Sequence, residues 1–335
     1  MELTTVADDH AVVHDGTSMR YHRGLTPDSV HELDGFLFRT LPRPGELLAR
    51  FATVNDVHFG EVECGIMEGL EMGPTFASEP GAEPYPELMN RSAIAEMGDA
   101  EPDVVVVKGD LTAEGTEEQY QRFCSFYGPA FGDRLVCTRG NHDVHGHATF
   151  AAEPTQRVEL PGAILAVLDT TVAGRAGGTV SAEQLEWLHD LAADADRPVY
   201  VFGHHPVWNP DSSDRRGAGF GIGVERSTRL VEAVAAHPVI RGYFAGHTHR
   251  NRVRRFSATR DVPWVEVACV KDFPGAWAEY RVHEGGLLQI FRRISSPAAL
   301  EWTERTRQMF GGLYVDYAFG ELGDRCFAVP SHPPS

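Results

Sequence analysis

The stretch Asp103-Val104-Val105-Val106-Val107-Lys108-Gly109-Asp110 places four consecutive valines directly before a lysine, a glycine and an aspartate. A short apolar run without polar alternation is typical of a strand that is buried on both faces, as in the parallel sheets of α/β proteins. Gly109 permits a tight turn where this strand ends. Because open α/β sheets bind ligands beyond the carboxyl ends of their strands, Asp110 stands where binding chemistry is expected.

Strands alternate with helices on both sides of this run. Strands are predicted over residues 50–55, 103–108, 134–138, 163–168, 198–202 and 239–244. Helices are predicted over 86–98, over 116–131, from 181 through 191 and over 225–236. After residue 249 the pattern is mostly β, over 252–257, 264–268, 278–282 and 287–294. This order of elements predicts a layered α/β core.

The sequence suggests three segments with different patterns. Residues 1–47 contain short predicted strands separated by turn residues, and 21–27 (Y-H-R-G-L-T-P) resemble the last strands of a fibronectin type III module. Such a module needs roughly 90–100 residues, so this segment is either a β-arm packed on the main domain or part of a distinct domain. The main domain is expected over 48–296, followed by a C-terminal extension over 297–335.

The chain has 335 residues and a formal net charge of −18, with 48 acidic and 30 basic side chains. Long nucleic acids and anionic membranes bind to clustered lysine and arginine, so neither is expected as a partner.

The five cysteines include no C-x-x-C pair, and the first residues lack an apolar leader. We therefore expect a cytoplasmic protein without disulfides or a thiolate zinc site. Only Lys108 and Lys271 are lysines, a bias that fits a G+C-rich genome.

Polar motifs follow five of the predicted strands. They are Asp56-Val57-His58, Gly109-Asp110, Gly140-Asn141-His142-Asp143, Gly203-His204-His205-Pro206 and Gly246-His247-Thr248-His249. Without a cation, so many polar groups would be costly to gather in one pocket. Carboxylates and neutral imidazoles bind divalent ions, and an extended D-x-H or H-x-H segment sends both side chains to one side. The motifs therefore predict a metal centre where the strands end.

In this order, D-x-H, G-D, G-N-H-D, G-H-H-P and G-H-x-H resemble the motifs of the calcineurin-like metallophosphoesterase superfamily, over roughly residues 51–249. The resemblance implies a four-layer α/β/β/α sandwich, here with a small N-terminal β extension. It also implies two divalent or trivalent ions, with Fe, Mn or Zn favoured. One ion would be held by Asp56, His58 and His249, the other by Asn141, His204 and His247, and Asp110 would bridge both.

The resemblance further implies how these groups act. His142 would point at the substrate phosphate as general acid or transition-state donor, whereas His205 and Asp143 are not expected to bind an ion. Two ions about 3.5–4 Å apart would activate a bridging hydroxide for in-line attack on phosphorus. Although the chain is acidic, the two carboxylates Asp56 and Asp110 would face four positive charges, so the predicted site is locally positive.

The motif contexts point to a branch of the superfamily. Residues 109–115 (G-D-L-T-A-E-G) and 168–170 (L-D-T) are similar to class III cyclic-nucleotide phosphodiesterases and bacterial glycerophosphodiesterases. Protein phosphatases continue the second motif as G-D-x-x-D-R-G, which this chain does not. We expect a metal-dependent phosphodiesterase acting on a small phosphoester such as a cyclic nucleotide or a glycerophosphodiester. A phosphomonoesterase and a non-catalytic metal-binding scaffold of the same fold are the alternatives.

Three irregular stretches lie outside the motifs. Residues 60–87 contain seven glutamates and no lysine or arginine, and Glu61 and Glu63 are either solvated or repel multiply charged substrates. Residues 206–223 form another long loop, and whether its Arg215 and Arg216 belong to a lid over the site is left open. The aromatic, glycine-rich residues 311–317 either cap the site, form a contact in a homo-oligomer or pack in the core.

Overall fold

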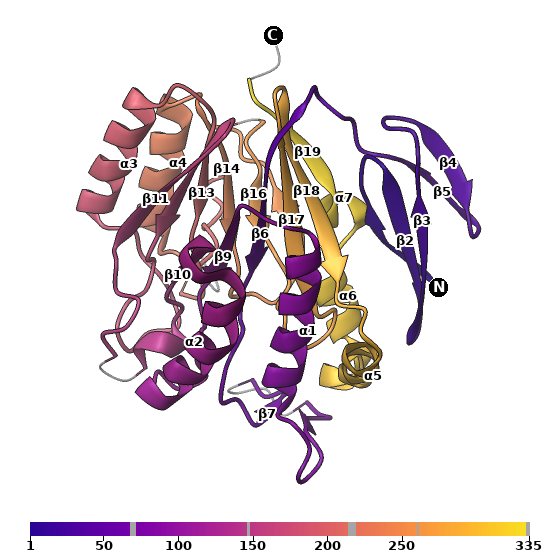
Figure 1. Cartoon of the computed structure of the whole chain (residues 1–335). Helices are drawn as coiled ribbons and strands as arrows, with labels where there is room; N and C mark the ends of the chain where they lie inside the picture. The colour runs from indigo at the N-terminus through magenta and orange to yellow at the C-terminus, as the bar shows by residue number, and fades with distance from the viewer. Residues whose placement is uncertain (68–71, 146–147, 214–218, 260, 333–335) are drawn as a thin grey trace.

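Two six-stranded sheets form the centre of the computed structural model, which describes residues 1–67, 72–145, 148–213, 219–259 and 261–332 (Figure 1). In spatial order, the first sheet contains β10 (Leu135–Thr138), β9 (Val104–Lys108), β6 (Leu47–Val54), β17 (Ala276–His283), β18 (Gly286–Arg293) and β19 (Phe327–Pro330). The second sheet contains β11 (Thr155–Leu160), β12 (Ala163–Leu168), β13 (Val199–Phe202), β14 (Ile240–Ala245), β16 (Trp264–Glu266) and β15 (Arg252–Arg254).

Parallel pairing brings the predicted strand ends to one edge of the molecule. In the first sheet β6, β9 and β10 are parallel, and β17 pairs antiparallel to β6. In the second sheet β12, β13, β14 and β16 are parallel. Since parallel strands end at the same edge, the residues that follow β6, β9, β10, β13 and β14 can meet there.

Helices cover the outer faces of both sheets, as Figure 1 shows. The outer layer of the first sheet contains α1 (Tyr85–Asp99), α2 (Glu117–Phe131) and α5 (Pro297–Thr306), and that of the second sheet contains α3 (Ala182–Asp194) and α4 (Val224–Ala236). In the valine strand, Val105 and Val107 face the helices, whereas Val106 packs between the sheets against residues such as Phe202 and Tyr280. The predicted four-layer α/β/β/α sandwich is confirmed.

Side-chain caps define where two of the predicted helices begin. Thr116 precedes α2 and accepts a hydrogen bond from the backbone N–H of Gln119 at 3.3 Å. Ser181 precedes α3 in a capping box with Gln184, in which each side chain bonds the other residue's backbone N–H. Such caps satisfy N–H groups that have no partner within the helix.

The N-terminal segment forms a sheet of β1 (Glu2–Val6), β2 (His10–Asp15) and β3 (Ser18–Arg23) and a hairpin of β4 (Val30–Leu33) and β5 (Phe36–Arg39). Strand β1 lies against β18, where the Thr5 hydroxyl donates to the Phe291 carbonyl at 2.7 Å. Glu2 forms an ion pair with Arg307 just beyond α5. These contacts fit a β-arm packed on the main domain, although the domain boundaries at 47 and 296 stay a prediction.

The C-terminal extension is joined to the core. After α5 it forms α6 (Tyr314–Phe319) and α7 (Leu322–Arg325) before β19 pairs with β18.

The loop after β6 contains the short pair β7 (Glu63–Cys64) and β8 (Phe76–Ala77). Arg215 and Arg216 lie outside the described residues, so whether they have a lid role stays open. All five cysteines are free thiols.

None of the helices in the described part of the chain is both long enough and apolar enough to span a membrane.

Candidate metal centre

All five motifs converge at the edge where the parallel strands end. Backbone hydrogen bonds continue the strand pairing into the motifs: His58 N–H donates to the Asp110 carbonyl at 2.9 Å. In the second sheet, Gly246 N–H donates to the His204 carbonyl at 2.9 Å. The first sheet thus contributes Asp56, His58, Asp110 and Asn141, and the second contributes His204, His247 and His249.

Five of these seven residues have left-handed backbone. Their φ angles are 55° at Asp56, 49° at His58, 50° at Asp110, 68° at His247 and 54° at His249. The predicted extended conformation of the D-x-H and H-x-H motifs is therefore wrong, and both motifs have left-handed residues at alternate positions instead. A non-glycine residue in this region costs on the order of 1–3 kcal/mol, and such strain is concentrated at functional sites.

Two motif glycines allow the loops to come close to the ligands. A Cβ on Gly140 would lie 2.2 Å from Asp110 Oδ1, and one on Gly109 would lie 2.5 Å from His204 Nδ1. Gly109 also has a φ of 88°. Any larger residue at either position would push the Asp110 or His204 side chain away.

Asp56, His58 and His249 form one cluster, whose potential ligand atoms lie within 4.8 Å of one another. His249 Nε2 lies 3.4 Å from Asp56 Oδ1. The carboxylate of Asp56 is fixed by the Asn55 amide and by His247 N–H, which donates to both oxygens at 3.1 Å. The resemblance assigned these three residues to one ion.

Asp110 lies between this cluster and the second. Its Oδ2 is 3.4 Å from His58 Nε2 and 3.2 Å from His204 Nε2. Burial would favour the neutral acid, but positive charge on His204 and His142 holds the pKa of Asp110 well below its usual range. One carboxylate oxygen thus faces a histidine from each cluster, which is the position expected of a bridging ligand.

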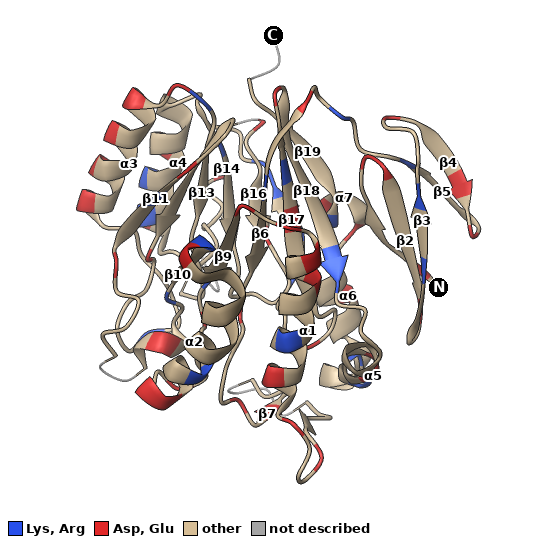
Figure 2. Ribbon diagram, viewed as in Figure 1, with Lys and Arg blue, Asp and Glu red and all other residues tan. Residues whose placement is uncertain are grey.

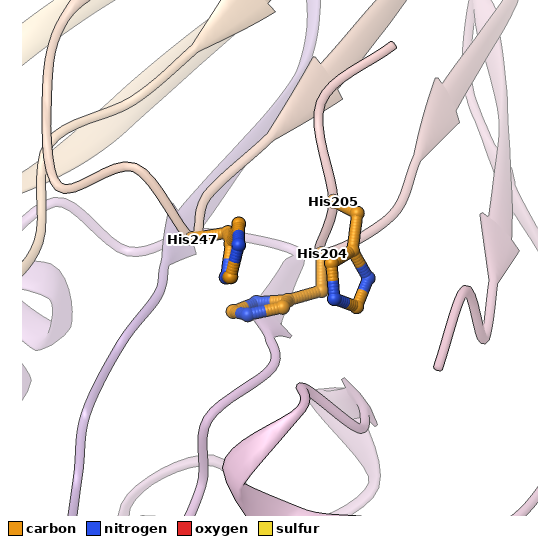
Figure 3. A group of neighbouring side chains, drawn as sticks. All are labelled: His204, His205 and His247. Carbon is orange, nitrogen blue, oxygen red and sulfur yellow. The ribbon is translucent and has the colours of Figure 1, made fainter. Parts of the chain in front are cut away.

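The second cluster gathers around His204. Its Nε2 lies 3.2 Å from Asn141 Oδ1, and its ring is 5.0 Å from that of His247 between centroids. Figure 3 shows His205 beside these two rings. However, His205 Nδ1 is 2.8 Å from the Thr170 hydroxyl and its Nε2 is 3.1 Å from the Ala176 carbonyl. Ligand atoms of His204, His205 and His247 also lie within 4.8 Å of one another, so the non-ligand role of His205 stays a prediction.

Several buried ring nitrogens in the centre lack a hydrogen-bond partner within the described part of the chain and could bind a cation. Both ring nitrogens of His58 and the Nε2 of His247 are buried with no hydrogen-bond partner among the residues that the structure describes. His204 Nδ1 lies 2.8 Å from the Lys108 carbonyl, so Nδ1 carries a proton and Nε2 faces the oxygens of Asp110 and Asn141. Burial alone would lower the pKa of His204, but the charge of Asp110 raises it to about 9. A positive charge is therefore favoured here, and this donor set fits divalent metal ions.

His142 and Asp143 lie beside Asp110, in the loop after β10. His142 Nδ1 lies 2.8 Å from the Ala113 carbonyl, and His142 N–H donates to Asp110 Oδ1 at 2.9 Å. The Asp143 carboxylate is buried and accepts hydrogen bonds from the backbone N–H groups of Leu111, Thr112 and Gly140 at 2.8–3.0 Å. Asp143 therefore ties two motif loops together and does not face the cluster as a ligand.

Four residues near the centre were given no role by the motifs: Glu61, Lys108, Lys271 and Asp272. Glu61 Oε2 lies 2.8 Å from Lys271 Nζ and accepts the Tyr85 hydroxyl at 2.6 Å, so Glu61 is a partly buried, ion-paired side chain. Glu63 is exposed and accepts a hydrogen bond from Thr75. Lys108 is buried and donates to the Ala245 carbonyl at 2.9 Å. Both lysines of this arginine-rich chain thus lie near the metal centre. Their rarity is the one feature of the sequence that could have indicated a special role for them.

Comparison with known proteins gives one family match. The calcineurin-like phosphoesterase family model matches residues 49–251. The chain is 29% identical over 163 residues to a glycerophosphodiester phosphodiesterase of Enterobacter lignolyticus, covering 44% of this chain and 56% of that protein. It is 30% identical over 176 residues to a cAMP/cGMP dual specificity phosphodiesterase of Mycobacterium tuberculosis, covering 49% of this chain and 52% of that protein. The chain thus spans about half the length of these curated relatives.

A solved structure supports the fold. A dimetal phosphatase from Danio rerio superimposes with a TM-score of 0.56 at 14% sequence identity, covering 74% of this chain and 98% of that one. At this identity the likeness concerns the fold alone. It agrees with the four-layer sandwich described above.

Proposed function

Because the chain belongs to the calcineurin-like phosphoesterase family, we propose that it is a metal-dependent phosphodiesterase with a two-ion centre. The observation that carries the proposal is the position of Asp110. Its Oδ2 lies 3.4 Å from His58 Nε2 in one cluster and 3.2 Å from His204 Nε2 in the other. A carboxylate that bridges two ions requires this placement.

The proposed ligands divide between the two clusters. Asp56, His58 and His249 would hold one ion, Asn141, His204 and His247 the other, and Asp110 both. When bound, a pair of such ions would supply a nucleophilic water of lowered pKa and positive charge for the phosphoryl oxygens. Manganese, iron and zinc all suit this mixture of imidazole and carboxylate donors.

His142 is proposed to act on the substrate. Its Nδ1 is held by the Ala113 carbonyl at 2.8 Å, which leaves Nε2 as the nitrogen available to a substrate oxygen. Its ring lies 4.6 Å from that of His58 between centroids, so it borders the first cluster. A histidine in this position could donate a proton to the leaving oxygen.

Small phosphodiesters are the proposed substrates. The names of the two relatives above refer to glycerophosphodiesters and to cyclic nucleotides, and we extend that substrate class to this chain. Acidic side chains lie on α2, on α3 and in the loop around β7 (Figure 2), and the net charge is −18. Long nucleic acids would be repelled by such a surface, whereas a small diester needs only the local charge of the centre.

Hydrolysis of a substrate panel tests the proposal. Bis-p-nitrophenyl phosphate, p-nitrophenyl phosphate, cyclic AMP and glycerophosphodiesters would be assayed with Mn, Fe, Zn and Co added separately. We expect the diesters to be hydrolysed faster, and chelation, Asp110→Ala or His204→Ala to abolish activity. Glu63→Gln, which changes an exposed carboxylate, is the control. Full activity in metal-free protein would refute the metal mechanism, and a preference for the monoester would refute the diesterase assignment.

A further inference from the structure

Lys271 joins a partly buried carboxylate and a buried one that come from distant parts of the chain. Its Nζ lies 2.8 Å from Glu61 Oε2, in the loop after β6, and 3.0 Å from Asp272 Oδ2, between β16 and β17. Lys271 is 3% exposed and Asp272 is 1% exposed. We refer to these three residues as the Glu61–Lys271–Asp272 bridge.

Each carboxylate of the bridge faces a histidine of the first cluster. Glu61 Oε1 lies 4.0 Å from His58 Nδ1, and Asp272 Oδ2 lies 3.9 Å from His249 Nδ1. The opposite nitrogen of each ring faces inward: His58 Nε2 lies 3.4 Å from Asp110 Oδ2, and His249 Nε2 lies 3.4 Å from Asp56 Oδ1. Both histidines thus stand between an inner and an outer carboxylate.

We propose that the Glu61–Lys271–Asp272 bridge positions His58 and His249 as ligands and sets the affinity of the ion that they share. The inference rests on the two-ion centre of the proposed function. A metal-binding histidine usually donates its other ring N–H to a carboxylate, which fixes the tautomer and makes the ligating nitrogen more basic. At 3.9–4.0 Å the Nδ1 atoms are beyond hydrogen-bond length, so the proposal requires each ring to move closer to its carboxylate when Nε2 binds the ion.

Other hydrogen bonds leave Glu61 Oε1 available to His58, whereas Asp272 Oδ2, which faces His249, also accepts a hydrogen bond from Lys271 Nζ at 3.0 Å. Tyr85 donates to Glu61 Oε2 at 2.6 Å, the same oxygen that Lys271 contacts. Asp272 Oδ1 accepts the Tyr314 hydroxyl at 2.7 Å and the Cys269 thiol at 3.0 Å. Glu61 Oε1 thus faces His58 Nδ1 at 4.0 Å, and Asp272 Oδ2 faces His249 Nδ1 at 3.9 Å.

The lysine explains how two more carboxylates, Asp272 buried and Glu61 partly buried, can lie close to Asp56 and Asp110. Without a counter-charge, burying Glu61 and Asp272 would be strongly unfavourable. A lysine ammonium is a compact charge with three donors and can therefore contact both carboxylates at once. In a chain with 28 arginines, lysine at this position fits that requirement for a compact charge.

The second cluster has a different kind of support. His204 Nδ1 lies 2.8 Å from the backbone carbonyl of Lys108, which is a neutral acceptor. Charged support is thus found behind His58 and His249, and neutral support behind His204. Removing charge from the bridge should consequently weaken one ion and spare the other.

Manganese binding to paired variants tests this difference. Glu61→Gln and Asp272→Asn would each be combined with His247→Ala, which impairs the second cluster, and with His249→Ala, which impairs the first. Equilibrium dialysis of Mn(II) gives the dissociation constant in each background. We expect about a 10- to 100-fold weakening with His247→Ala and less than about twofold with His249→Ala. Glu63→Gln, the same change two residues away on an exposed carboxylate, should have no effect.

Equal weakening in both backgrounds, or none with His247→Ala, would overturn the proposal. A second measurement covers a variant that folds poorly: in the Zn(II)-loaded protein labelled with ¹⁵N-histidine, the Nδ1–H proton signals report each ring separately. Glu61→Gln should shift the signal of His58 alone, and Asp272→Asn that of His249 alone. If neither signal responds, the bridge does not position these rings.

These readouts are independent of phosphodiesterase activity. If the parent protein binds two ions and shows the expected selectivity but hydrolyses no diester, the substrate assignment fails and the bridge stands. If diesters are hydrolysed but the variants bind Mn(II) as the parent does, the bridge fails and the proposed function stands.

Discussion

The ring of His142 is oriented by a backbone carbonyl in the loop after β9 and not by a side chain of either cluster. Because the Ala113 carbonyl holds Nδ1 at 2.8 Å, removing the ring should leave the ligands in place. The backbone N–H that donates to Asp110 at 2.9 Å is also retained in any substitution except proline. His142 can therefore be tested separately from metal binding.

We expect His142→Asn to keep both ions and to lower kcat by about 10²- to 10⁴-fold on diesters with alkyl leaving groups, since general acid catalysis contributes that much. p-Nitrophenolate leaves without a proton, so the loss on bis-p-nitrophenyl phosphate should be much smaller. Metal content and steady-state kinetics on both substrates provide the measurement. An equal loss on both would argue that His142 stabilises charge and does not donate a proton.

Residues inside the motifs could be placed from sequence, and those outside could not. Strand ends fix where Asp110 or His204 lies, because parallel strands end at one edge. Glu61 and Lys271, by contrast, are 210 positions apart, and no local pattern reports that they meet. The left-handed backbone of Asp56 and His58 was also missed, since histidine and aspartate do not require it.

At the scale of elements, the N-terminal β-arm is attached through buried polar contacts. His14 on β2 lies 2.8 Å from the Thr4 hydroxyl through Nδ1 and 3.0 Å from the Ser295 hydroxyl, beyond β18, through Nε2. Burial, together with the positive charge of Arg293, lowers the pKa of His14 to about 3. The neutral ring therefore belongs to the docked state of the arm.

This lowered pKa predicts a loss of stability in acid. An unfolded histidine titrates near 6.5, so between about pH 6.5 and 3 the unfolded chain holds one more proton than the folded chain. The contribution is complete above pH 6.5, and the free energy of unfolding should fall by about 1.4 kcal/mol per pH unit below it. Urea unfolding of chelated protein at pH 4–7 measures this slope.

We expect His14→Gln to remove that part of the slope. His31→Gln, in the hairpin of the same arm, controls for replacing a histidine; its ring bonds only the nearby Thr26 carbonyl among the hydrogen bonds described. The same pH slope in the parent and in His14→Gln would contradict the prediction.

Strong local signals determined which elements could be predicted. Helix α2 begins where Thr116 caps it, and β12 spans the predicted residues 163–168 because it is apolar throughout. Strand β11 was missed because half-exposed residues dilute its alternation, and β19 because it is a short edge strand that ends at Pro330. Edge elements take their structure from the partner strand, which local sequence does not encode.

At the scale of the whole molecule, packing the two sheets together brings buried carboxylates and histidines close to one another at their common edge. Asp56 and Asp110 are buried beside His204, and their ligand atoms lie within 4.8 Å of one another. Bound cations would relieve the crowded oxygens and would bind only the folded chain. Metal binding should therefore stabilise the complete fold.

We expect each Mn(II) ion to raise the free energy of unfolding by about 2.7 kcal/mol when its free concentration is about 100 times the dissociation constant. Thermal unfolding of chelated protein, with and without added Mn(II), measures the change. Asp110→Asn, which removes the shared charge, should lose most of it. An unfolding temperature that does not respond to Mn, Zn or Fe would contradict the proposed centre.

The layer order of the whole molecule followed from the alternation of strands and helices together with the family motifs. Composition alone could not have provided it, because a net charge of −18 says nothing about which strands pair. The contact between the arm and the C-terminal extension was not predictable either. It depends on contacts such as the hydrogen bond from Arg325 to the Leu3 carbonyl at 2.8 Å, more than 300 residues apart.

The left-handed backbone at five of the seven proposed ligands has a consequence for laboratory evolution. A glycine at any of these positions would relieve conformational strain, so in a screen for heat resistance without metal the fittest clones should include inactive ones. Adding metal during selection would reverse that preference. A library built on this scaffold would therefore retain its chemistry only if the ion is present in the growth medium and in the challenge step.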